Sequence, residues 1–144
     1  RAVPRRGGSD EAPVEATPLG VASTAASAVL DEDKLGALLR IGAGPDFLDE
    51  LIGGFLRDSQ GSIERMASAL AERDYPALRA AVHALKGSAA ELGAARLIAL
   101  CVELRTLRPF ELDSAKAKAL LADLRAAHDE TAHLLEAFAQ RARG

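Results

Sequence analysis

The chain has few aromatic residues: four Phe, one Tyr and no Trp among 144 residues. Because β-sheets are enriched in aromatic and β-branched side chains, this scarcity argues against a sheet-based fold. Alanine, leucine, glutamate and arginine dominate instead, and all four are good helix formers. No apolar run approaches the ~20 residues of a membrane span, so we expect no direct membrane contact.

Cysteine and net positive charge are also lacking. The single cysteine, Cys101, excludes an internal disulfide. Cys101 is in phase with Leu97 and Leu104 on a helix, so we expect it in the core. The formal net charge is −3, which argues against nucleic-acid binding because that function demands a basic surface. The length suits one domain with a hydrophobic core.

The first 28 residues differ from the rest of the chain. Residues 1–19 hold three Pro, three acidic residues and three Arg without any sustained hydrophobic period, and residues 20–28 are mostly small. Such a segment buries too little apolar surface to offset its ordering entropy. We therefore expect a flexible linker over residues 1–28 and a helical domain over residues 29–144.

Apolar residues then recur at helical spacing, and proline, glycine and capping residues divide the pattern. We expect five helical segments: from the cap Asp31 to about Gly42, from Pro45 to about Arg73, from Pro76 to Gly93, over residues 95–107, and from the cap Asp113 onward. Short connections between the four longer segments predict an all-α, antiparallel up-down four-helix bundle. The short first helix should cover one end of it.

The third segment contains the sequence His83-Ala-Leu-Lys86-Gly87-Ser-Ala-Ala90. Helical residues at i+3 and i+4 share a face, so Lys86 and Gly87 flank His83. The imidazole thus has a cation on one side and no neighbouring bulk on the other. This pattern suits a histidine that accepts an anionic group from a large partner.

The same helix has a separate apolar stripe made of Leu78, Val82, Leu85, Ala89 and Leu92. His83 lies roughly 140° from the centre of that stripe and Gly87 roughly 180°, so both should face solvent. A glycine in a helix interior costs about 1 kcal/mol relative to alanine. Close approach of another molecule is one reason for it.

This stretch resembles the signature of histidine-containing phosphotransfer (Hpt) domains, which reads His-x-Leu-Lys-Gly-Ser followed by small residues. The match extends over roughly residues 30–140, through Phe47–Leu51 before the motif and Leu97–Leu104 after it. The resemblance implies that His83 is the phosphoacceptor and that Lys86 helps to neutralise the phosphoryl group. We expect the partner-facing surface to comprise Arg79, Gly87, Ala90 and Arg105. Arg105 departs from the glutamine that several family members carry near the histidine.

The resemblance also implies a partner and a context. His83 would accept a phosphoryl group from the aspartyl phosphate of a receiver domain, in cis or in trans, and pass it on. We expect this chain to bind no cofactor of its own, with Mg²⁺ on the receiver. No kinase, protease or hydrolase signature is present, so we expect no autonomous catalytic activity. We expect a monomeric, cytoplasmic domain at the C-terminus of a bacterial hybrid sensor histidine kinase that is itself cytoplasmic or membrane-bound.

Two other functions stay open at this point. One is a structural or docking bundle in which His83 is idle. The other is the phosphoacceptor domain of a chemotaxis-type kinase, which the sequence neighbouring this chain would reveal. A metal site is disfavoured, because His128 and His133 are five residues apart and fall on different faces of a helix.

Overall fold

The computed structural model describes residues 29–42 and 44–144, and all helices in this part of the chain pack into one bundle. The helices are α2 (Glu32–Ile41), α3 (Pro45–Glu72), α4 (Tyr75–Leu92), α5 (Ala95–Leu104) and α6 (Ala115–Arg143), with a 3-10 turn, η1 (Pro109–Glu111), before α6. The described residues contain no strand. The linker predicted over residues 1–28 lies outside them.

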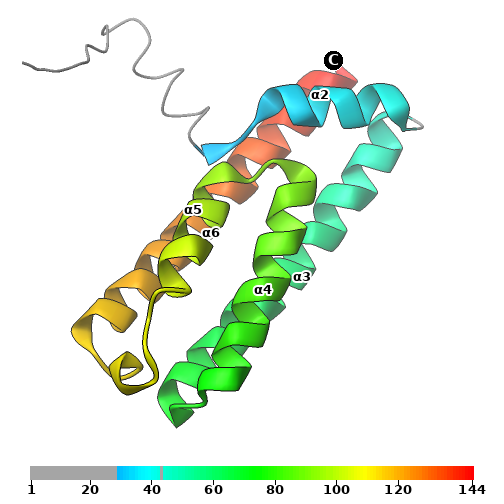
Figure 1. Ribbon diagram of the computed structural model, residues 1–144. Coiled ribbons are helices and arrows are strands. Elements are labelled where there is room, and N and C mark those ends of the chain that lie inside the picture. The colour runs from blue at the N-terminus through cyan, green and yellow to red at the C-terminus, as the bar shows by residue number, and fades with distance from the viewer. Residues whose placement is uncertain (1–28, 43) are drawn as a thin grey trace, which may run out of the picture.

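Helices α3, α4, α5 and α6 form a closed ring. Helix α3 packs on α4 and α6, and α5 packs on the same two helices. From α3 to α6, each helix runs in the opposite direction to the one before it (Figure 1). Helix α2 lies across one end of the bundle, beside the C-terminus. This arrangement confirms the predicted antiparallel up-down four-helix bundle with a short additional helix.

Capping residues set most helix ends where the sequence predicts them. The Asp31 carboxylate accepts a hydrogen bond from the backbone N–H of Lys34 and caps α2. Gly93 ends α4 in the left-handed conformation, with φ of 73°. The Gly93 carbonyl also accepts a hydrogen bond from the backbone N–H of Asp31 at 2.7 Å. The end of α4 is thereby joined to the start of α2.

Two predicted helix ends are wrong. Helix α5 ends at Leu104 rather than at residue 107, because the Thr106 hydroxyl donates to the Glu103 carbonyl at 2.6 Å and competes with the helical bonding pattern. Ser114, not Asp113, caps α6: its hydroxyl accepts from the backbone N–H of Ala117. Asp113 instead forms an exposed ion pair with Arg73.

The core is almost entirely aliphatic. Leucine from every helix dominates it, and Cys101 is completely buried there as predicted. Burial raises the pKa of the Cys101 thiol to about 12. Four polar residues are buried among the described residues, namely Ser59, Ser62, His128 and Thr131. No described helix combines the length and the apolar character that crossing a membrane would require.

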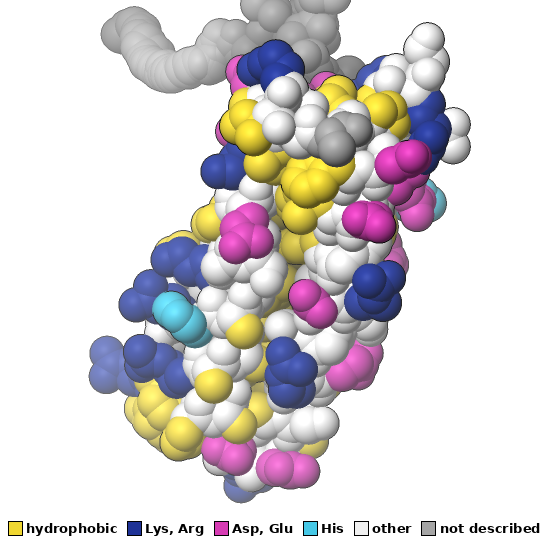
Figure 2. Space-filling model, turned by 90° about the vertical axis from the view of Figure 1, so that its right-hand side faces the viewer, with side chains coloured by type: hydrophobic (Ala, Val, Ile, Leu, Met, Phe, Trp, Pro, Cys, Tyr) yellow, Lys and Arg dark blue, Asp and Glu magenta, His cyan; other side chains and the backbone are white. Residues whose placement is uncertain are grey.

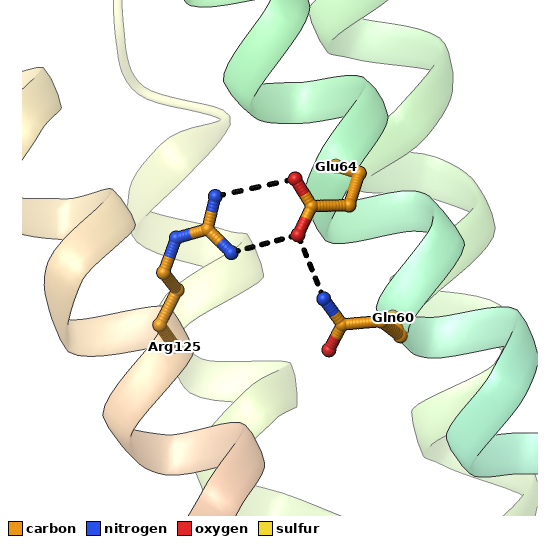
Figure 3. Close-up of polar contacts among 3 residues, drawn as sticks. All are labelled: Gln60, Glu64 and Arg125. Atoms are coloured by element: carbon orange, nitrogen blue, oxygen red, sulfur yellow. Dashed lines mark hydrogen bonds and ion pairs between the residues drawn. The ribbon is translucent and has the colours of Figure 1, made fainter.

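The exposed surface between α3 and α6 carries a small polar network. Arg125 contacts both carboxylate oxygens of Glu64, at 3.0 and 3.5 Å, and the Gln60 amide donates to the same carboxylate at 2.7 Å (Figure 3). The Arg125 hydrogen bond lowers the pKa of Glu64 below its ordinary value. Because both side chains are largely exposed, solvent screens the pair and it contributes little to stability.

A buried histidine links the same two helices inside the bundle. His128 Nε2 of α6 lies 2.7 Å from the Ser59 hydroxyl oxygen of α3, and Ser59 donates its own proton to the Leu56 carbonyl at 3.2 Å. Ser59 and His128 therefore share a short buried hydrogen bond that joins α3 to α6. Desolvation lowers the pKa of His128 below its ordinary value of 6.5, and neighbouring Asp129 offsets part of the effect.

This histidine predicts an acid-sensitive fold. Because the folded-state pKa of His128 lies below its unfolded value, the unfolded chain binds more protons once the pH falls below about 6.5. The free energy of unfolding should decline from there by up to about 1.4 kcal/mol per pH unit. Urea denaturation between pH 7.5 and 5, above the range where carboxylates titrate, measures this decline.

The matched control is the exposed His133 on the same helix. His133→Gln should keep the wild-type pH dependence, whereas His128→Leu should flatten it. An equal slope in the wild type and in His128→Leu would show that another group causes the acid sensitivity.

Candidate functional site

The predicted phosphoacceptor lies on the solvent-facing side of α4. Leu78, Val82, Leu85, Ala89 and Leu92 of the predicted apolar stripe are all buried. His83 is exposed, on the opposite side of the helix from most of that stripe. Asp74 caps the start of α4 with a carboxylate that accepts from the Ala77 N–H, so His83 is held on a helix that is well defined at both ends.

A surface pocket of about 430 Å³ surrounds the imidazole. Its lining joins α4 to the end of α5 and consists of the six predicted site residues: Arg79, His83, Lys86, Gly87, Ala90 and Arg105. Three of the six side chains are cationic and none is a carboxylate. The structure therefore brings these residues together, while their roles in phosphotransfer stay predictions.

Gly87 leaves the space beside His83 open. A Cβ atom built on Gly87 would meet no heavy atom within 4 Å, and its φ is not left-handed, so neither packing nor backbone conformation requires glycine here. The other glycine of this helix region, Gly93, does have a conformational reason. The absence of a side chain at Gly87 keeps one side of the imidazole accessible.

Lys86 lines the pocket around His83 together with Arg105 at the end of α5. Burial raises the pKa of the Cys101 thiol of α5, and the positive charge of Lys86 offsets a part of this rise. Side chains in a helix also point back toward its N-terminus, which directs Lys86 toward the turn that holds His83. Lys86 thus contributes a cation to the pocket that holds His83.

Arg79 is held on the other side of His83. Its guanidinium donates to the Tyr75 hydroxyl at 3.0 Å and stacks over the Tyr75 ring at 5.7 Å from the ring centre. Arg79, one helical turn before His83, contributes positive charge to the pocket. Its guanidinium is also bound to Tyr75, so it is less free than an unpartnered side chain. The sequence pattern did not predict this contact.

The other two histidines lie away from this pocket. His128 is buried against Ser59, and His133 is exposed on α6, so they do not form a pair. Within the described ranges, 29–42 and 44–144, no group of three or more His, Cys, Asp or Glu side chains is arranged to hold a metal ion. The buried contact between His128 and Ser59 was not predicted, because it joins residues 69 positions apart.

Comparison with known proteins agrees with this geometry. Histidine-containing phosphotransfer protein 2 of Arabidopsis thaliana is 39% identical over 64 residues, which cover 42% of this chain and 41% of that protein. The chain thus matches about two fifths of that relative's length. The crystal structure of histidine-containing phosphotransfer protein B (HptB) from Pseudomonas aeruginosa PAO1 superposes with a TM-score of 0.68 and 27% identity, covering 78% of this chain and 95% of that one.

The family assignment covers most of the bundle. Residues 50–142, well over half of the 144-residue chain, match the model of the Hpt domain. This range includes α3, α4, α5 and α6 almost completely and all six residues that line the pocket around His83. The chain belongs to the Hpt domain family.

Proposed function

We propose that this Hpt domain is a phosphorelay carrier that holds the phosphoryl group on His83. His83 accepts the group from the aspartyl phosphate of one receiver domain and passes it to the aspartate of another. The observation that carries this proposal is the pocket itself: an exposed imidazole on a rigid helix, bordered by three cations, with no carboxylate in the lining. The Hpt family match supports it.

The chemistry requires little from this chain. An unprotonated imidazole nitrogen of His83 attacks the phosphorus, and the P–N bond forms as the bond to the aspartyl oxygen breaks. The aspartate leaves as a carboxylate with the electron pair. The charge of the transferring group is spread over its three outer oxygens, which positioned cations stabilise. Lys86 is the nearest such cation along the helix.

We assign the Mg²⁺ of the reaction to the receiver domain. Mg²⁺ prefers oxygen ligands, above all carboxylates, and the pocket around His83 offers cationic and apolar side chains instead. A receiver that brings its own metal and an aspartyl phosphate meets a surface of opposite charge here. Such complementarity favours association between the two proteins.

The decisive experiment compares two donors. The purified chain should acquire no label from ATP and Mg²⁺ alone, and it should acquire label when a phosphorylated receiver domain is added. Transfer back to an unphosphorylated receiver should deplete that label. Self-labelling from ATP by protein free of contaminating kinase would instead identify an enzyme and contradict the carrier function.

We also propose that the carrier works in the cytoplasm, within a hybrid sensor kinase or beside one. The composition of residues 1–28 supports a tether to a preceding domain, since this segment holds three prolines and its apolar residues follow no regular spacing. Sequencing the gene on both sides tests this context. A receiver domain upstream supports it, and dimerisation and ATP-binding domains downstream would indicate a chemotaxis-type kinase.

Lys86→Ala should slow phosphoryl transfer without preventing receiver binding. The substitution removes a cation beside the incoming phosphoryl group, and we expect a rate loss of about tenfold, equivalent to about 1.4 kcal/mol. Rapid-quench measurement of transfer from a labelled receiver gives the rate. Lys116→Ala removes the same charge from the exposed first turn of α6 and should transfer normally. Equal rates in the two variants would contradict a role for Lys86.

A further inference from the structure

Three cations border His83, and they differ in what else they contact. Figure 2 shows Lys and Arg side chains gathered around an exposed histidine at one edge of the bundle. None of Arg79, Lys86 and Arg105 forms an ion pair with any described residue. Their positive charge is therefore uncompensated within the described part of the chain, which makes the pocket a site for an anion.

Arg105 is the cation with the fewest constraints. It caps the C-terminus of α5 through its backbone N–H, which donates to the Cys101 carbonyl at 3.0 Å. Its exposed side chain makes no hydrogen bond to a described residue, whereas Arg79 is engaged by Tyr75. Of the two guanidinium groups in the pocket, that of Arg105 is the one available for a ligand.

Arg105 also approaches the pocket from a different helix. His83 and Lys86 belong to α4, whereas Arg105 directly follows α5, and all three residues line the same pocket. Cations from α4 and from the end of α5 thus border the pocket that holds the imidazole.

We propose that Arg105 is a phosphoryl-binding residue, which together with Lys86 forms a two-helix oxyanion cradle around His83. This inference rests on the proposed function and extends it to a residue that is a glutamine in several Hpt domains. A guanidinium presents several N–H donors in a fixed plane and suits a tetrahedral oxyanion better than a neutral amide does. The ligand class is a phosphate oxyanion, either the phosphoryl group on His83 or free inorganic phosphate.

The cradle should change the acidity of the bound phosphoryl group. Nearby cations favour its dianion over its monoanion, so they lower the pH at which it titrates. An exposed ion pair of ordinary strength corresponds to a shift of about half a pH unit, or roughly threefold in the protonation equilibrium. A residue with a merely structural role would not move this midpoint.

The first experiment follows the phosphohistidine directly. Wild type, Arg105→Gln and Arg96→Gln are phosphorylated with a phosphorylated receiver, freed of it, and titrated by ³¹P NMR. Arg96 is an exposed arginine at the start of α5 that does not line the pocket, so its substitution is a matched loss of charge. We expect the midpoint of Arg105→Gln to rise by about half a unit and that of Arg96→Gln to stay within about 0.1 unit. Equal midpoints in the two variants would overturn the inference while leaving His83 as the carrier.

The second experiment needs no phosphorylation and therefore separates the two proposals. Unphosphorylated wild type and Arg105→Gln are titrated with inorganic phosphate while the His83 ring is followed by NMR. We expect Arg105→Gln to bind phosphate roughly threefold more weakly, and Arg105→Lys to restore part of the affinity. Identical titrations would overturn the cradle. If His83 accepts no phosphoryl group in the first experiment, the proposed function fails and this titration alone decides whether the anion site exists.

Discussion

His83→Gln is expected to abolish phosphoryl acceptance completely. Glutamine keeps a polar side chain of similar reach but offers no nucleophilic nitrogen, because its amide nitrogen is a donor only. His83 is exposed, so the free energy of unfolding should change by less than about 0.5 kcal/mol. Label transferred from a phosphorylated receiver and a urea denaturation curve measure the two effects.

His133→Gln provides the control, because His133 is also an exposed helical histidine. It should accept the phosphoryl group at the wild-type rate. Retention of label in His83→Gln would mean that another residue is the phosphoacceptor. A loss of label in both variants would point to a general effect on receiver binding.

Gly87→Leu is expected to stop transfer while leaving the bundle at least as stable. The new side chain enters open space, since a Cβ at Gly87 meets nothing within 4 Å, and leucine is favoured over glycine in a helix by roughly 0.8 kcal/mol. It would point back toward His83, one turn earlier, and cover the imidazole against the receiver. Because small displacements of reacting atoms are costly, transfer should fall by about a hundredfold or more.

Two variants separate access from helix stability. Gly87→Ala gains at least as much helix propensity as leucine does while adding a single carbon, so it should stabilise the fold and slow transfer far less than leucine. Gly36→Leu makes the same change on α2, which does not line the pocket, and should transfer normally. Wild-type transfer by Gly87→Leu would show that the receiver docks on another face.

Most of the fold follows from local signals in the sequence. Asp31, Pro45 and Gly93 each act on their own turn, so the bounds they set for α2, α3 and α4 were predictable. The end of α5 and the cap of α6 were not, because Thr106 and Ser114 compete there with equally plausible neighbours. Side-chain hydrogen bonds set the end of α5 and the start of α6, and the spacing of apolar residues does not indicate such bonds.

The pocket was predictable where it depends on one helix. Spacing along α4 places Lys86 and Gly87 beside His83. Arg105 came from the family resemblance, and only the structure shows that it borders the same pocket as His83. Contacts between segments far apart in the sequence could not be predicted from the spacing of residue types. The buried hydrogen bond between Ser59 and His128 is the clearest example, because nothing in the residues next to either side chain indicates a partner on another helix.

The central claim is that the phosphoryl group resides on His83. Its most direct test is tandem mass spectrometry of the chain after incubation with a phosphorylated receiver, under alkaline conditions that preserve phosphohistidine. We predict a single phosphoryl group on the peptide that contains His83, at its imidazole. A phosphoryl group on His128, on His133 or on any other residue, with His83 unmodified, would contradict the account.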